Sequence, residues 1–129
     1  MLKTVNPATG RIVETYETHS DKGVEKIINA TDKSWHQWRT TSFTQRGALM
    51  QNISTILRSR KEELARIMAL EMGKVLREGI AEIEKCAWVC EYYAHNAESF
   101  LENEFIETEA FRSFVTYQPL GTILAVMPW

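Results

Sequence analysis

The chain has 129 residues, and its 15 Lys and Arg against 17 Asp and Glu give a net charge of −2 at pH 7. Hydrophobic residues make up 44% and charged residues 25%, which is ordinary globular usage and argues against a disordered protein. A near-neutral chain without a basic stripe lacks the positive field that nucleic-acid partners require. The length suits one domain with a single core.

The N-terminal residues and the two cysteines bear on the cellular compartment of the protein. The first residues, 1–7, contain no apolar segment typical of a secretory signal. No apolar run approaches the ~18 residues of a membrane span, so we predict no membrane partner. Cys86 and Cys90 stand four apart, which places them on one helix face rather than in a disulfide framework. We therefore predict a cytoplasmic protein.

The cysteine pair has competing interpretations. A metal site would need further ligands at suitable spacing, and a nucleophile would need a base or a helix N-terminus to lower the thiol pKa. Neither is evident around Cys86 or Cys90, which are predicted to lie mid-helix. The pattern favours two buried thiols that behave as small hydrophobic side chains, and no metal site is predicted.

The first two predicted elements are a hairpin and a helix. Residues 3–5 and 11–15 are β-prone, and the turn between them contains Asn6, Pro7 and Gly10, which suit a tight reversal. Ser20 is a good N-cap for a helix whose apolar residues, from Val24 to Trp38, recur with the helical period. The period gives this helix one apolar face, and Trp35 and Trp38 on it are predicted to pack in the core.

Three more helices are predicted. Thr41 or Ser42 caps the second, which breaks near Ser59, and the third ends near Gly73, a typical residue after a helix. The fourth, long helix begins soon after Lys74 and continues to residue 101. Its charged residues are expected to form a solvated face: Arg77, Glu78, Glu82, Glu84 and Lys85.

The last segment changes character. Residues 102–109 are acidic and are expected to form a turn or loop, and residues 111–118 alternate between apolar and polar. After a turn at 119–121, residues 122–127 form a continuous apolar run typical of a parallel strand buried on both faces. No earlier segment offers this strand a parallel partner. The chain therefore has the pattern expected of a fragment that ends on its most core-like strand.

Four segments, in this order and spacing, resemble the aldehyde dehydrogenase superfamily. Together they cover the whole chain. The amino-acid sequences of the long helix and of residues 117–121 are most like those of bacterial succinate-semialdehyde dehydrogenases. The segments are the Asn-Pro-Ala-Thr-Gly hairpin at 6–10, Trp38 with Arg46 and Leu49, the Glu-Met-Gly-Lys element at 71–74 with Glu82, and the Pro-Leu-Gly to Pro-Trp stretch at 119–129.

The resemblance implies a fold and a reaction. The fold class is α/β: a β-hairpin, about four helices, then the first strands of a dinucleotide-binding domain. In the implied reaction a cysteine thiolate attacks an aldehyde, hydride passes to NAD or NADP, and a thioester is hydrolysed to the carboxylic acid. The parent enzyme is expected to bind a small-molecule aldehyde, succinate semialdehyde, and to form a homo-oligomer.

The resemblance also limits the site. The family's oxyanion-hole Asn would come directly after Trp129, and its cofactor-binding Lys, general-base Glu and nucleophilic Cys come later. No catalytic residue is therefore carried over, and the 129-residue chain is expected to be inactive. The cofactor-binding residues carried over are Met127, Pro128 and Trp129, which correspond to the segment beside the nicotinamide-ribose end. Lys85 is a hypothetical substrate-binding cation for an anionic aldehyde, with a solvated lysine as the alternative.

The implied organisation is an incomplete N-terminal part of an NAD(P)-binding domain over 1–129, with a hairpin at 1–18, a helical layer at 20–101 and strands at 111–129. Two other interpretations stay open. A stand-alone helical interaction module without catalysis would show no exposed apolar strand. A truncated product that docks on an intact subunit would co-purify with it.

Overall fold

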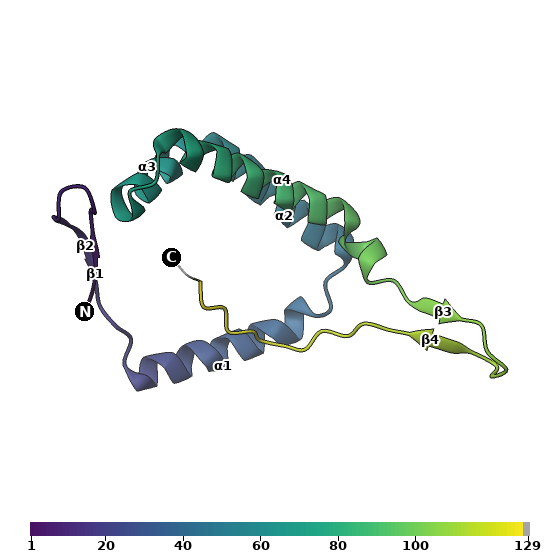
Figure 1. Ribbon diagram of the computed structural model, residues 1–129. Coiled ribbons are helices and arrows are strands. Elements are labelled where there is room, and N and C mark those ends of the chain that lie inside the picture. Colours follow the sequence, from purple (N-terminus) through teal and green to yellow (C-terminus); the bar gives the residue numbers. More distant parts are fainter. Residues whose placement is uncertain (128–129) are drawn as a thin grey trace.

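The computed structural model describes residues 1–127, which form four helices and four strands (Figure 1). The N-terminal hairpin pairs β1 (Leu2–Val5) with β2 (Ile12–Tyr16) in antiparallel register, with a shift between Thr4 and Val5. Asn6 Oδ1 accepts a hydrogen bond from the Ala8 N–H at 2.9 Å, and Gly10 takes a φ of 69°. The predicted hairpin and its turn chemistry are thus confirmed.

Helix α1 (Asp21–Trp38) begins at the predicted cap, where Ser20 Oγ accepts a hydrogen bond from the Gly23 N–H at 3.2 Å. Its predicted apolar face is present, but the predicted core packing of Trp35 and Trp38 is wrong, because neither residue is buried and Trp38 is 46% exposed. The helix contains no buried residue, and Ile28 remains 57% exposed. Periodicity identifies an apolar face, but burial also needs a second element to cover it.

Helix α2 (Phe43–Ser59) begins with a capping box. Ser42 Oγ accepts from the Gln45 N–H at 3.1 Å, while Gln45 Oε1 accepts from the Ser42 N–H at 3.0 Å. Two backbone donors that the helix leaves unpaired are satisfied reciprocally. Of the two caps that the sequence allowed, Ser42 holds this position, and Thr41 instead donates to the Trp38 carbonyl.

We expect Ser42→Ala to lower the free energy of unfolding of the 129-residue chain by about 1 kcal/mol, because the Gln45 N–H loses its acceptor. Urea unfolding followed by circular dichroism measures this change. The matched control is Thr44→Ala, two residues along the same exposed turn. Equal midpoints for the Ser42→Ala variant and the unsubstituted chain would contradict the assignment.

Helix α3 (Lys61–Met72) ends at Gly73, which has a φ of 71° in the left-handed region. A Cβ added there would lie 2.9 Å from Pro7 Cγ, so the turn of the hairpin packs closely against the end of α3. Glycine is required both for the dihedral angle and for the close approach. The Asn-Pro-Ala-Thr-Gly and Glu-Met-Gly-Lys motifs, more than sixty residues apart, therefore meet in space.

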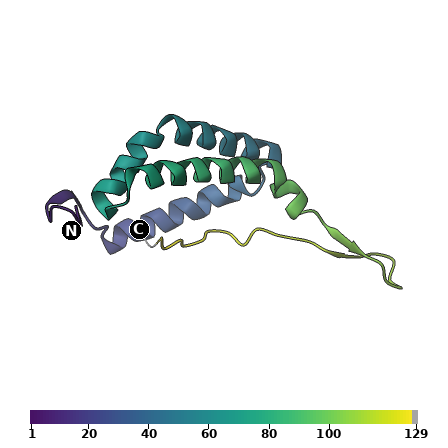
Figure 2. The ribbon, with the colours of Figure 1, turned by 45° about the horizontal axis from the view of Figure 1, so that its top comes forward.

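The long helix α4 (Leu76–Phe100) packs along α2 and α3, and these three helices form one layer (Figures 1 and 2). The buried positions all lie where these helices meet: Ser54, Ala65, Gly79, Ile83 and Ala87. Small residues at these positions allow the helix backbones to approach closely. In the described part of the chain, no helix is long and apolar enough to cross a membrane.

The segment after α4 differs from the sequence expectation in two places. The acidic stretch that was expected to be a loop contains β3 (Glu104–Ile106), which pairs antiparallel with β4 (Ser113–Val115) in a projecting hairpin (Figure 1). Residues 122–127 do not form the predicted buried strand: Leu124 is 88% exposed and Val126 is 82% exposed. A strand requires a hydrogen-bonded neighbour, and residues 1–127 supply none for this segment.

Candidate functional site

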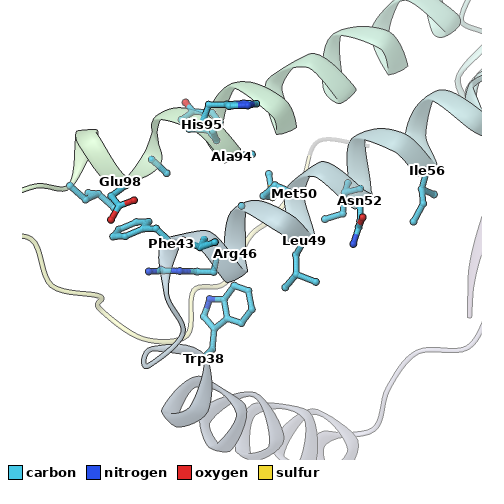
Figure 3. A pocket seen from close by; sticks show the side chains of 16 residues that line it. Trp38, Phe43, Arg46, Leu49, Met50, Asn52, Ile56, Ala94, His95 and Glu98 are labelled. Carbon is cyan, nitrogen blue, oxygen red and sulfur yellow. The ribbon is translucent and has the colours of Figure 1, made fainter.

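The motif residues Trp38, Arg46 and Leu49 line one apolar groove of about 860 Å³ between α2 and the end of α4 (Figure 3). The Arg46 guanidinium lies 4.4 Å from the centre of the Phe43 ring, a cation–π arrangement. Arg46 Nε is buried without a hydrogen-bond partner among the described residues. The groove therefore combines an apolar surface with one buried donor that still requires an acceptor, and His95 and Glu98 are titratable α4 side chains on its wall.

Lys85, the predicted substrate-binding cation, lies on an exposed face of α4. It lines a shallow hollow of about 690 Å³ that is formed by α4 residues alone, and it takes part in none of the ion pairs found within residues 1–127. Cys86 and Cys90 line the same hollow. The prediction that both thiols are buried is wrong, because Cys86 is exposed and Cys90 is half-buried.

Glu82, in the same hollow, forms an ion pair with Lys74. The side chains of Lys74 and Glu82 are only 25% and 34% exposed. The pair joins the two parts of the Glu-Met-Gly-Lys…Glu element across the start of α4. The expectation of a fully solvated face is therefore wrong for Glu82, and it is also wrong for Glu84, which pairs with Lys61 at 2.6 Å.

A network of ion pairs centred on Arg58 holds α2, α3 and α4 together. Arg58 Nη2 donates to Glu91 Oε2 at 3.0 Å, and Arg58 Nε donates to Glu84 Oε2 at 3.1 Å. The buried Ser54 hydroxyl accepts from Arg58 Nη1 and donates to Glu91 Oε1, both at 2.8 Å. The Ser54 hydroxyl and both carboxylate oxygens of Glu91 thereby gain partners.

The network shifts the pKa of its carboxyl groups. The hydrogen bond from Arg58, assisted by the one from Ser54, lowers the pKa of Glu91 to about 2. The hydrogen bond from Lys61, followed by the one from Arg58, lowers the pKa of Glu84. Both groups are therefore held ionised, which suits a structural role and not proton transfer near neutral pH.

The predicted cofactor residues lie at the end of the chain. Met127 is 68% exposed on the extended segment that follows Gly121. Pro128 and Trp129 lie outside the described residues. The preceding Thr122 and Ile123 border α1 beside Trp35, whereas Lys85 lines a hollow formed by α4 residues, so among residues 1–127 the two predicted sites lie on different elements.

Sequence reasoning missed two features of this region. The Arg58–Glu91 pair joins residues 33 positions apart, and no local spacing indicates such a pair. The unpaired Arg46 Nε was equally invisible, although Arg46 belongs to a recognised motif. The only available signal was a charged residue three positions before the apolar Leu49 and four before Met50.

Comparison with known proteins shows which family these motifs belong to. Residues 1–129 match the aldehyde dehydrogenase family, and the chain belongs to this family. It is 44% identical over 128 residues to a probable NADP⁺-dependent succinate-semialdehyde dehydrogenase of Synechocystis, covering 99% of this chain and 28% of that protein. It is 40% identical over 132 residues to the NADP⁺-dependent succinate-semialdehyde dehydrogenase of Mycobacterium avium, with the same two coverages.

The fold agrees with this assignment. The crystal structure of succinic semialdehyde dehydrogenase from Streptococcus pyogenes with NADP⁺ superposes with a TM-score of 0.83 at 27% identity, covering 88% of this chain and 25% of that one. The predicted resemblance to aldehyde dehydrogenases, and in particular to succinate-semialdehyde dehydrogenases, is confirmed. The chain spans 28% of the length of the two curated relatives named above.

Proposed function

We propose that this chain is the N-terminal part of an NADP-dependent aldehyde dehydrogenase that oxidises succinate semialdehyde to the carboxylic acid. The observation that carries the proposal is 44% identity over 99% of the chain to a relative with that name. The division into a hairpin, a helical layer and entering strands of the cofactor-binding domain belongs to the same proposal. Of the two cofactors that the sequence left open, the names of the relatives support NADP.

The described residues fit one end of this cofactor and not the other. The exposed, apolar segment ending at Met127 suits van der Waals contact with the planar face of the nicotinamide ring. The same segment carries no cation for the phosphates, which must be held by groups supplied elsewhere in the parent. When bound, the cofactor would supply the hydride acceptor. The role of this chain is then to position Met127, Pro128 and Trp129 against it.

The exposed 122–127 segment supports the dehydrogenase proposal over the stand-alone interaction module. Ile123 is 76% exposed and Leu124 is 88% exposed, and an exposed apolar run of this kind is unfavourable for an independent module because it promotes aggregation. The projecting β3–β4 hairpin, with Phe105 63% exposed, offers apolar surface for the proposed homo-oligomer. The unpaired thiols on α4 fit a reducing compartment, which supports a cytoplasmic location.

The test compares the 129-residue chain with a version extended through the downstream reading frame of its gene. NADPH formation from succinate semialdehyde is followed by absorbance. We expect turnover by the extended version and none by the short chain, because no residue of the short chain matches the family's nucleophile, base or oxyanion hole. An extended version that is inactive on every aldehyde tested would overturn the proposal. Co-purification of the short chain with an intact subunit would instead indicate a docking product.

Lys85 gives a finer prediction for the substrate. In the extended enzyme we expect Lys85→Ala to raise KM for succinate semialdehyde about two- to fivefold, the effect of losing one exposed ion pair. KM for a neutral aldehyde of similar length should not change. Arg77→Ala, which removes another exposed cation from α4, is the matched control. An unchanged KM for the anionic aldehyde would leave Lys85 as a solvated surface residue.

A further inference from the structure

Cys86 and Cys90 are both free thiols in the shallow hollow on α4, where Cys86 is exposed and Cys90 is half-buried. Neither residue has a role in the proposed dehydrogenase chemistry. Because they are four residues apart in one helix, their side chains lie on the same face, one turn apart. The hollow therefore presents two soft sulfur ligands to solvent.

The helix geometry favours a bridging atom over a disulfide. Side chains four apart in a helix have Cβ atoms about 5–6 Å apart. A disulfide requires about 3.5–4.5 Å between its Cβ atoms, so direct S–S bonding would distort α4. A metal–thiolate bond of about 2.3 Å, the length found for zinc, allows one central atom to join sulfurs up to about 4.6 Å apart. One bridging cation therefore fits this spacing without unwinding the helix.

The surroundings select the kind of cation. Zinc and iron–sulfur sites take about four ligands, and residues 1–127 contain no group of three or more His, Cys, Asp or Glu that could hold a metal. Glu82, the carboxylate in the hollow, is already paired with Lys74. Two thiolates alone suit a soft cation that accepts two-coordinate sulfur ligation, as copper(I) does.

We propose that Cys86 and Cys90 form a two-thiolate site for one soft monovalent cation of the copper(I) class. Binding releases two protons, one from each thiol, and forms two metal–sulfur bonds without electron transfer. The resulting centre carries one negative charge. The Lys85 ammonium lines the same hollow and offsets that charge. This proposal does not rest on the proposed dehydrogenase function, although both proposals use Lys85.

The experiment titrates copper(I) anaerobically into the 129-residue chain against a colorimetric copper(I) chelator, and X-ray absorption reports the sulfur ligands. We expect one copper(I) per chain with two sulfur ligands. Cys86→Ser and Cys90→Ser should each weaken binding at least about tenfold, because a single thiolate cannot bridge. Circular dichroism verifies the helix content of each variant. If Cys90→Ser lowers the helix content because Cys90 is half-buried, the test rests on Cys86→Ser, whose side chain is exposed.

A matched control keeps two thiols but separates them. Cys90→Ser combined with Trp88→Cys places the thiols two residues apart on different faces of α4, and Trp88 is 57% exposed and therefore open to substitution. This variant should bind copper(I) as weakly as the single substitutions. Binding by the control or by either single-thiol variant that equals binding by the unsubstituted chain would overturn the proposal. A stoichiometry of two chains per copper would also overturn it.

Discussion

Gly79→Val is expected to lower the free energy of unfolding of the 129-residue chain by about 1–3 kcal/mol, the usual cost of forcing extra methyl groups into a packed contact. A Cβ added at Gly79 would lie 3.1 Å from Ala65 Cβ and 3.3 Å from Ala65 Cα. The second atom belongs to the α3 backbone, so the clash cannot be relieved by turning a side chain. The helices α3 and α4 would have to separate at their closest contact.

Gly79→Ala and Gly23→Ala complete this series. Replacing a mid-helix glycine by alanine contributes about 0.5–1 kcal/mol of stability through reduced backbone entropy. At Gly23 the nearest atom to an added Cβ is Ser20 Oγ at 3.4 Å, an ordinary contact, so this variant should be as stable as the chain or slightly more stable. Gly79→Ala should fall between the two. Urea midpoints that rank Gly79→Val at or above the unsubstituted chain would refute the close α3–α4 contact.

Arg58→Met should destabilise the chain at neutral pH more than Ser42→Ala does. The substitution keeps much of the apolar stem but leaves Glu91, Glu84 and the buried Ser54 hydroxyl without their shared donor. Unpaired polar groups at a helix contact cost more than the pair contributes when intact. Arg60→Met is the matched control, since the Arg60–Glu63 pair is more than half exposed and joins the residue before α3 only to the first turn of that helix.

The same variant should change the pH dependence of stability. The folded pKa of Glu91 is lowered to about 2 from an ordinary value of 4.5, and the pKa of Glu84 is lowered too. Depressed carboxyl pKa values contribute stability that is fully present above the unfolded pKa and is lost as pH falls through the folded one. The unsubstituted chain should therefore lose stability from about pH 4.5 down to about pH 2.

Arg58→Met removes the first cause of the Glu91 shift, so its stability should fall less over this window and approach that of the unsubstituted chain near pH 2. Urea midpoints collected at neutral pH and at several points across the acid window measure the two profiles. Parallel profiles would show that Arg58 does not hold Glu91 ionised. The Arg60→Met profile should follow that of the unsubstituted chain except for the small effect of Glu63, whose pKa is also lowered.

The features that the sequence predicted correctly depend on few neighbouring residues. The Ser42 cap of α2, one of the two candidates, depends on residues within four positions, and Gly73 marks the end of α3 by its own dihedral angle. The hairpin turn at 6–10 is equally local. Short-range interactions of this kind fix the local backbone conformation, which explains why the helix boundaries were predicted to within a few residues.

The features that failed depend on distant partners. Residues 122–127 have the composition of a buried strand, but composition does not supply the neighbouring strand that completes its hydrogen bonds. Cys86 was placed correctly on the long helix, but its burial was not. The face of α4 that is buried depends on where α2 and α3 pack, and Cys86 lies outside that face. Of the candidate site, Lys85 was placed on the correct element, whereas its role and those of Met127, Pro128 and Trp129 remain predictions.

Helix α1 has no buried residue, whereas α2, α3 and α4 each contribute to the packed layer. Most of the stability of a helix in a protein comes from packing of its apolar face, so α1, which buries no residue, draws little stability from tertiary contacts. Its amide hydrogens should exchange with solvent through local opening, well before those at the α2–α4 contact, which require the layer itself to unfold. In a parent enzyme, slower amide exchange in α1 would then indicate that further parts of the polypeptide pack against this helix.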